Sequence, residues 1–126
     1  DGIRVSGSGN SLLRNNFGSF KDVKFGIFLS DAGDTHVVHN TFRMDSDGDI
    51  LVVVSGDNIN SYNNVMINEG TGTVYASLTA FTSDYNLVYS SGEEFSSDDD
   101  TFELHQEKSG QDVNSSSLLP EFTNET

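Results

Sequence analysis

The chain has 126 residues, a length that fits a single domain. Twenty Asp and Glu against six Lys and Arg give a formal net charge of −14, which argues against nucleic acid or an anionic membrane surface as partners because phosphate recognition needs clustered basic side chains. Cysteine is absent, which excludes disulfides and thiolate metal sites, and no apolar run approaches the length of a membrane span. Gly, Ser and Asn are frequent and strong helix formers are scarce before residue 90, so a mainly β domain is predicted.

Two markers recur along residues 1–89 in the same register. The first is a short run of alternating apolar residues. Its starting points, in steps of 24, 23 and 24 residues, are Gly2, Gly26, Asp49 and Thr73. The second is an Asn that follows a basic or aromatic residue. It stands, in steps of 25, 23 and 23 residues, at Asn15, Asn40, Asn63 and Asn86. The agreement of the two markers indicates a structural repeat of 23–25 residues.

Each repeat predicts three short strands in chain order. The first strand places pairs of apolar residues inward, namely Ile3 and Val5, Ile27 and Leu29, Ile50 and Val52, and Val74 and Ala76. A turn rich in Gly, Ser and Asp follows, then a second strand before the Asn and a third strand after it. A single repeat cannot bury its apolar face alone, so the repeats must stack. The sequence therefore predicts an all-β parallel β-helix, a solenoid of about four coils over residues 1–89, with an acidic irregular cap over residues 90–126.

The recurring asparagines have a structural explanation. Stacked coils bring equivalent amides to one strand spacing, where they hydrogen-bond to one another in a ladder. We expect this ladder at Asn15, Asn40, Asn63 and Asn86. The alternative is that each Asn only adopts the left-handed conformation of a turn.

The repeat and the end of the chain resemble a known family. An Asn followed two residues later by an aliphatic or aromatic residue is similar to the coil pattern of right-handed parallel β-helices in the pectate-lyase-like superfamily. Ser83–Tyr89, Ser109–Ser115 and Leu119–Phe122 are similar to the closing segment of many secreted bacterial β-helix proteins, although Leu119 and Glu121 depart from its usual ending. The resemblance implies a right-handed helix, an extracellular or cell-surface location, and a chain that is the C-terminal part of a longer protein.

The resemblance covers proteins with many activities, so it does not decide between enzyme and binding protein. Lyases of this superfamily abstract a proton with Arg or Lys beside calcium-binding acids, and none of their motifs is matched here residue for residue. We therefore assign no catalytic residue. Polysaccharide lyase or hydrolase activity is expected only if the chain is part of a longer enzyme.

Two groups of acids are candidates for calcium. Asp34 and Asp57 occupy corresponding turns of successive coils, about 5 Å apart if stacked, where like charges repel unless a cation lies between them. Asp45, Asp47 and Asp49 alternate as in a calcium loop, without the Gly and Glu positions of an EF-hand. The alternative for both groups is solvated turn acids. No other cofactor is predicted.

Two outward columns are candidates for carbohydrate binding, because rings spaced by one strand, about 4.8 Å, nearly match the pitch of a sugar chain and suit sugar faces. The first column comprises Arg4, Phe28, Leu51 and Tyr75. The second, just before the ladder, comprises Arg14, His39, Tyr62 and Tyr85. The alternative is stacking between coils beneath a covering loop. The charge favours a neutral glycan, or an anionic one bridged by calcium.

Three function classes follow. The first is a secreted or cell-surface module that binds or acts on polysaccharide. The second is a structural or adhesive solenoid, such as a filament subunit or a tailspike-like fibre: the first coil exposes a sheet edge that a preceding segment or another copy must cover, and end-to-end stacking need not close. The third is ice binding, ranked last because a regular outward Thr array is missing.

Overall fold

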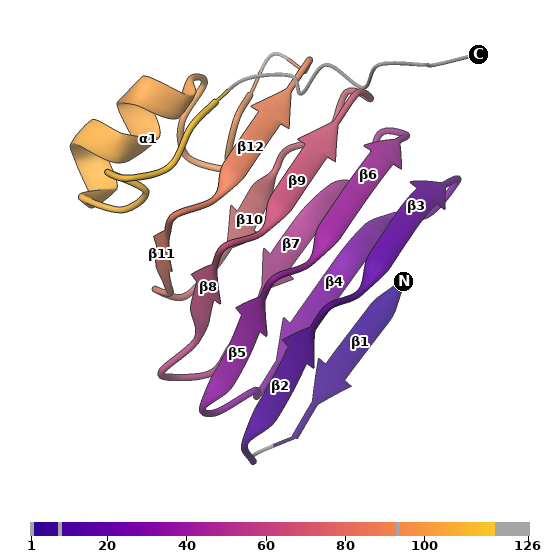
Figure 1. Ribbon diagram of the computed structural model, residues 1–126, viewed down its shortest axis with the longest axis vertical. Coiled ribbons are helices and arrows are strands. Elements are labelled where there is room, and N and C mark those ends of the chain that lie inside the picture. The colour runs from indigo at the N-terminus through magenta and orange to yellow at the C-terminus, as the bar shows by residue number, and fades with distance from the viewer. Residues whose placement is uncertain (1, 8, 93, 118–126) are drawn as a thin grey trace.

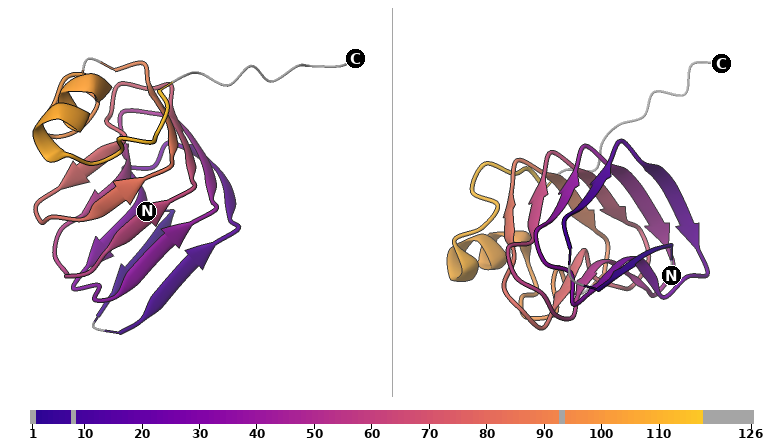
Figure 2. Two further views of the ribbon diagram at one scale, coloured as in Figure 1. Left: turned by 60° about the vertical axis from the view of Figure 1, so that its left-hand side comes forward. Right: turned by 90° about the horizontal axis from the view of Figure 1, so that it is seen from below.

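The computed structural model describes residues 2–7, 9–92 and 94–117. The chain forms a parallel β-solenoid of about four turns, with 46% of the described residues in strands and 7% in helix. Each turn, called a coil from here on, gives one short strand to each of three parallel sheets, A, B and C (Figures 1 and 2). The predicted fold class is confirmed. Leu119–Phe122 of the closing motif lies outside the described residues.

The strands follow one another around the solenoid in a fixed order. Sheet A contains β1 (Ile3–Ser6), β4 (Phe25–Ser30), β7 (Asp49–Val53) and β10 (Tyr75–Ser77). Sheet B contains β2 (Ser11–Arg14), β5 (Thr35–Val38), β8 (Asn60–Tyr62) and β11 (Thr82–Asp84). Sheet C contains β3 (Phe17–Lys21), β6 (Thr41–Asp45), β9 (Val65–Asn68) and β12 (Leu87–Ser90).

The register of sheet A differs by one residue from the prediction in the third and fourth coils. Ile27 lies beside Leu51, and Leu51 lies beside Tyr75. Leu51 and Val53 therefore continue the inward column that was predicted for Ile50 and Val52. A shift of one residue moves every side chain of a strand to the other face, so the predicted outward column changes as well.

The apolar core fills the space between the three sheets. Leu29 and Val53 enter it from sheet A, Val37 from sheet B, and Phe42 and Met66 from sheet C, all of them buried. The alternation of buried and exposed residues along the strands is clearest in β5 and β6, where every second side chain points inward. Burial of these side chains between stacked coils is the main driving force for the fold.

The asparagine ladder exists, with two of its four members shifted by one residue. Nδ2 of each Asn donates to Oδ1 of the Asn in the following coil, at 2.8, 3.0 and 3.1 Å. The members are Asn16, Asn40, Asn64 and Asn86. Asn15 and Asn63, which were predicted as members, instead occupy the preceding turn position with φ of 57° and 56°. The two alternatives for the recurring Asn thus apply to neighbouring residues of the same turn.

After β12 the chain covers the end of the fourth coil as an incomplete fifth coil. Ser96 forms a bridge to Tyr75 beside sheet A, and Ser116 forms one to Leu87 beside sheet C. Beside sheet B, the Asp112 N–H donates to the Ser83 carbonyl oxygen at 2.7 Å. We call residues 94–117 the cap.

The cap contains α1 (Phe102–Ser109), where an irregular segment was expected. Thr101 caps its first turn by accepting a hydrogen bond from the Leu104 N–H at 3.1 Å, and Gly110 ends it with a φ of 67°. Phe102 packs edge to face on Phe95 at 5.3 Å between ring centres, which fixes the helix on the core. The helix lies at the β11–β12 end of the solenoid, away from β1 (Figures 1 and 2).

Candidate functional site

The outward face of sheet B carries polar and aromatic side chains in two columns along the solenoid axis. They point outward because the intervening residues, such as Val37 and Ser61, are buried. The first column is Leu12, His36, Asn60 and Thr82. The second column is Arg14, Val38, Tyr62 and Asp84. We call these residues together the sheet B face.

The four residues predicted to form one column just before the ladder lie in two columns of the structure, because the strands are not in the predicted register. Arg14 and Tyr62 lie in one column of the sheet B face. His39 and Tyr85 lie one position later, at the turn into sheet C, each with a φ of 55°. Tyr85 is 58% exposed, and His39 is exposed as well. All four residues therefore stand in adjacent columns along one side of the solenoid.

A shallow pocket of about 370 Å³ borders the sheet B face at the first two coils. It is lined by Asn10, Ser11, Leu12, Asp34 and His36. The amide, hydroxyl, carboxylate and imidazole groups surround an apolar Leu12 that is 57% exposed. An apolar contact surrounded by a few polar groups is the arrangement that binding sites for small polar molecules share.

The predicted column on sheet A is exposed only in its first two members. The Arg4 guanidinium lies over the Phe28 ring, 4.5 Å from the ring centre. Leu51 and Tyr75 are 0% and 1% exposed, so the prediction that they line an outward surface is wrong. The one-residue register shift places both in the core. The outward positions next to Phe28 along the axis are Val52 and Ala76.

The register of the strands also decides which turn residues lie opposite the acids considered for calcium. Asp34 faces Asn58, whose Nδ2 donates to Asp34 Oδ1 at 2.5 Å. Asp57 is not the stacking partner of Asp34, because the Asp34 N–H bonds the Asp57 carbonyl oxygen at 3.1 Å. Asp49 Oδ1 accepts from the N–H and the Oγ1 of Thr73, both at 2.9 Å.

Asp45 and Asp47 are exposed, and Asp45 lies beside Lys21 in the register of sheet C. Within residues 2–7, 9–92 and 94–117, no three Asp, Glu or His side chains come together in a group that could hold a metal ion. The alternation of Asp45, Asp47 and Asp49 in the sequence spans the corner between β6 and β7.

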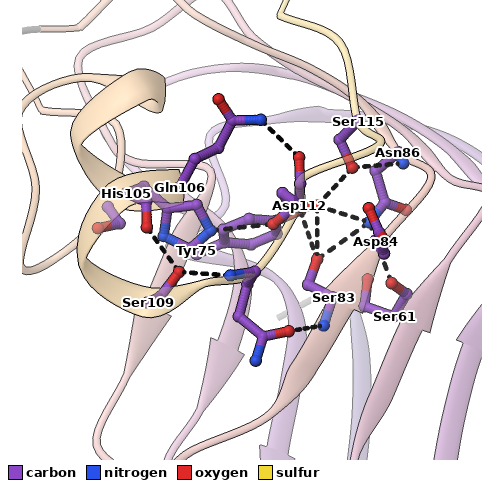
Figure 3. Close-up of polar contacts among 12 residues, drawn as sticks. Ser61, Tyr75, Ser83, Asp84, Asn86, His105, Gln106, Ser109, Asp112 and Ser115 are labelled. Atoms are coloured by element: carbon purple, nitrogen blue, oxygen red, sulfur yellow. Dashed lines mark hydrogen bonds and ion pairs between the residues drawn. The ribbon is translucent and has the colours of Figure 1, made fainter.

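A buried polar network in the cap, centred on Asp112, was missed by the sequence analysis (Figure 3). Asp112 is 1% exposed. Its Oδ1 accepts hydrogen bonds from Ser83 Oγ at 2.9 Å, Asn86 Nδ2 at 3.2 Å and Ser115 Oγ at 2.6 Å. Its Oδ2 lies 2.9 Å from Nε2 of His105. The carboxylate thus joins the last ladder Asn to the helix of the cap.

His105 connects this carboxylate to a second one. Its Nδ1 lies 3.8 Å from Asp99 Oδ2, and Lys108 Nζ forms an ion pair with Asp99 Oδ1 at 3.1 Å. The ring of His105 packs between Tyr75 and Phe95, with ring centres 5.4 and 5.3 Å apart. The Asp112 carboxylate is hydrogen-bonded on both oxygens, whereas Asp99 Oδ1 has the Lys108 ammonium group nearby but no hydrogen bond.

A cleft of about 290 Å³ lies between the cap and the fourth coil. Asp99, His105 and Gln111 line it from the cap, and Phe81 and Ser77 line it from the coil. Gln111 Oε1 accepts from the Ser83 N–H at 2.8 Å and His105 Nε2 is paired with Asp112, so these two groups of the cleft attach the cap.

The network also determines the protonation of Tyr75. Burial, followed by the nearby negative charge of Asp112, raises the pKa of the Tyr75 phenol well above its ordinary value of 10.0. Ser83 Oγ gives its only proton to Asp112, so at 3.1 Å the Tyr75 hydroxyl is the donor to Ser83. The phenol is therefore a neutral donor inside the core.

Sequence reasoning could not find this network because Asp112 lies 26 residues after Asn86, beyond the helix that interrupts the fifth coil. One signal was present. Asp112 stands in the Ser109–Ser115 segment that resembles a closing turn, where an acid at a near-repeat distance from the last ladder Asn indicates the end of the ladder.

No family model, curated protein or solved structure matches the chain. Among the described residues, no helix has the length and hydrophobicity needed to cross a bilayer. The functional argument therefore depends on the geometry of the solenoid surface.

Proposed function

We propose that the protein is a carbohydrate-binding β-solenoid module whose glycan lies along the solenoid axis on the sheet B face and the turn beside it. The observation that carries the proposal is the alignment of Arg14, His39, Tyr62 and Tyr85 in adjacent, solvent-accessible columns. Each coil contributes one of these four side chains, alternating between the two columns, so successive coils, one strand spacing apart, each offer a contact to a glycan that lies along the axis.

The chemistry of the face favours a neutral glycan. The sheet B face and its pocket offer one guanidinium, amides, hydroxyls and the carboxylates of Asp34 and Asp84, so no cluster of cations is present to attract a polyanion. Arg4 over Phe28 on sheet A is a second, smaller contact surface for the same class of ligand. Calcium binding by the exposed Asp45 and Asp47 is a separate part of the proposal, because these residues lie at the corner between sheets C and A rather than on the sheet B face.

The proposal also covers the superfamily, the location and the context of the protein. The solenoid is a right-handed β-helix related to the pectate-lyase-like superfamily, the protein acts outside the cell or at its surface, and it contributes binding to a longer protein. The supporting observations are the parallel coils, the Asn ladder and the closing segment at Ser109–Ser115.

The test is calorimetric titration with a panel of neutral hexose oligosaccharides of at least six units. We expect binding that Tyr62→Ala and Tyr85→Ala each weaken at least about tenfold, since aromatic contacts dominate such sites. Tyr89→Ala is the matched control, because Tyr89 is a partly exposed tyrosine on sheet C. Absence of binding across the panel, or an equal loss in the Tyr89 variant, would contradict the proposal.

A further inference from the structure

The cleft between the cap and the fourth coil combines negative and aromatic groups. Asp98 and Asp99 contribute carboxylates to its lining, Phe81 contributes an aromatic ring, and four serines contribute hydroxyl groups. Of the described residues that line it, none is a lysine or an arginine. The imidazole of His105 is already paired with Asp112 through Nε2 at 2.9 Å. The cleft therefore offers acceptors and a ring to a ligand that carries positive charge.

Asp99 is incompletely hydrogen-bonded although it is only 6% exposed. Its Oδ2 accepts from Ser96 Oγ at 3.4 Å and lies 3.8 Å from His105 Nδ1, so its contacts on that side are long. Its Oδ1 has no hydrogen-bond partner among the described residues. A buried carboxylate oxygen without a hydrogen bond costs free energy. Asp99 is therefore ready to accept from a donor that enters the cleft.

Lys108 supplies positive charge to Asp99 without satisfying it. Its Nζ lies 3.1 Å from Asp99 Oδ1, but the pair does not have hydrogen-bonding geometry. The lysine side chain is 57% exposed, so packing does not hold it in place. Ion pairs made by exposed lysines contribute little, because the long side chain loses rotamer freedom and water competes for the charge. An ammonium group of a ligand can therefore replace Lys108 beside Asp99.

The other side chains of the cleft suit a small molecule that carries both carbon and hydroxyl groups. Phe81 is half-buried and packs edge to face on the buried Tyr75, with ring centres 5.3 Å apart, so its ring is held in place while part of it stays accessible. Aromatic faces attract both apolar groups and cations. Ser77 from the coil and Ser97 from the cap can exchange hydrogen bonds with ligand hydroxyls. A volume of about 290 Å³ is at the lower end for ligand pockets and fits a small ligand.

The charge of the cap as a whole also favours a cation. Residues 94–117 hold seven acidic residues and one lysine, a formal net charge of −6 with histidine neutral. A negative field over a cleft raises the local concentration of cations and repels anions. Phosphorylated and carboxylated compounds are therefore disfavoured as ligands of this cleft.

We propose that the cap cleft binds a small primary ammonium compound with hydroxyl groups, the chemistry of an amino sugar. Its ammonium group lies between the carboxylates of Asp98 and Asp99, and its carbon skeleton packs on Phe81. Lys108 occupies the ammonium position when the cleft is empty and moves into solvent when the ligand binds. The proposal is independent of the glycan on the sheet B face, because none of the cleft residues belongs to that face.

The test is calorimetric titration of the whole chain with glucosamine at pH 6, where its amine is protonated. Glucose is the ligand control, because it differs only by a hydroxyl group in place of the ammonium group. Both titrations are made at a salt concentration of about 0.15 M, where distant charges are largely screened. We expect glucosamine to bind at least about tenfold more tightly than glucose.

Four variants separate the cleft from the general negative charge of the cap. Asp98→Asn and Asp99→Asn should each weaken glucosamine binding at least about tenfold, since each removes one carboxylate from the site. Asp100→Asn is the matched control, because Asp100 is as exposed as Asp98 but does not line the cleft. Lys108→Gln removes the competing ammonium group and should strengthen binding several-fold.

If circular dichroism shows that Asp99→Asn is unfolded, the exposed positions Asp98 and Lys108 carry the test, because their side chains are not part of the core. Three results would each overturn the proposal: equal or undetectable binding of the two sugars, an equal loss in Asp98→Asn and Asp100→Asn, or no gain in Lys108→Gln. None of them bears on the carbohydrate proposal, whose panel contains only neutral oligosaccharides.

Discussion

Tyr75 shows how one residue reports on the attachment of the cap. Burial, and then the charge of Asp112, raise the pKa of its phenol, so the contribution of neutral Tyr75 to stability is complete below the ordinary pKa of 10.0. That contribution is lost as the pH rises through the higher pKa of the folded state. We expect a late step in a tyrosinate absorbance titration that coincides with unfolding. Tyr75→Phe should lack this step; a step that persists in Tyr75→Phe would assign it to another tyrosine.

The pKa of the Asp84 carboxyl group shifts in the direction opposite to that of Tyr75. Partial desolvation raises the pKa of its carboxyl group, but hydrogen bonds from Asn114 Nδ2 at 2.8 Å, the Asn114 N–H at 2.7 Å and the Tyr85 N–H at 2.9 Å outweigh this and lower the pKa from 3.8. The stabilisation is present above the ordinary pKa and is lost as the pH falls through the lowered one.

Asp84→Asn should therefore lower the melting temperature slightly near pH 6, since the site is close to the surface and the effect is below about 1 kcal/mol. The difference between the variant and the natural chain should shrink between pH 6 and pH 2, as the pH falls through the lowered pKa and the natural carboxyl group becomes protonated. Thermal unfolding followed by circular dichroism at both pH values is the measurement. A difference that is the same at pH 2 and pH 6 would show that charge is not its cause.

At the scale of the elements, the ladder and the turn before it make different demands on neighbouring asparagines. Asn64 donates to Val37 O at 2.8 Å and to Asn86 Oδ1 at 3.1 Å, and its Oδ1 accepts from Asn40 N and Nδ2, both at 3.0 Å. Asn64→Ala leaves these buried groups unpaired and should cost about 2–4 kcal/mol in urea unfolding. Asn63→Gly, at a φ of 56°, should change the stability by less than about 1 kcal/mol. Equal losses would contradict the assignment of Asn64 to the ladder.

The repeat, the three strands per coil and the existence of the ladder could be predicted from the sequence, because they depend on period-two patterns and a constant step. The register within a coil could not. Asn15-Asn16 and Asn63-Asn64 are doublets, so either member fits the marker. Ile50–Val53 is a continuous apolar run that is buried throughout, so it shows no alternation that would distinguish its inward from its outward face. The doublets misplace two ladder members by one residue, and the apolar run shifts the sheet A column by one position, which is why Tyr75 was assigned to the surface.

At the scale of the whole molecule, the negative charge is concentrated towards the capped end. Residues 44–126 hold sixteen acidic residues and one basic residue, so of the total of −14 the first 43 residues contribute +1 and the remainder −15. Hydroxyl and amide partners satisfy several of these carboxylates, as at Asp49 and Asp112, without neutralising them. Mutual repulsion destabilises the compact state, and the effect of exposed charges is screened by salt.

We therefore expect NaCl to raise the melting temperature by a few degrees between low and physiological ionic strength. Comparing CaCl2 and MgCl2 at matched ionic strength separates screening from specific binding, since screening acts equally with either salt. The calcium hypothesis adds a further increase with CaCl2 that the double variant Asp45→Asn and Asp47→Asn loses, because these exposed acids are two residues apart in the sequence at the corner between β6 and β7. Identical melting curves in CaCl2 and MgCl2 would contradict the calcium hypothesis and leave screening as the only effect of salt. A fall in melting temperature with added NaCl would contradict the argument that mutual repulsion destabilises the fold.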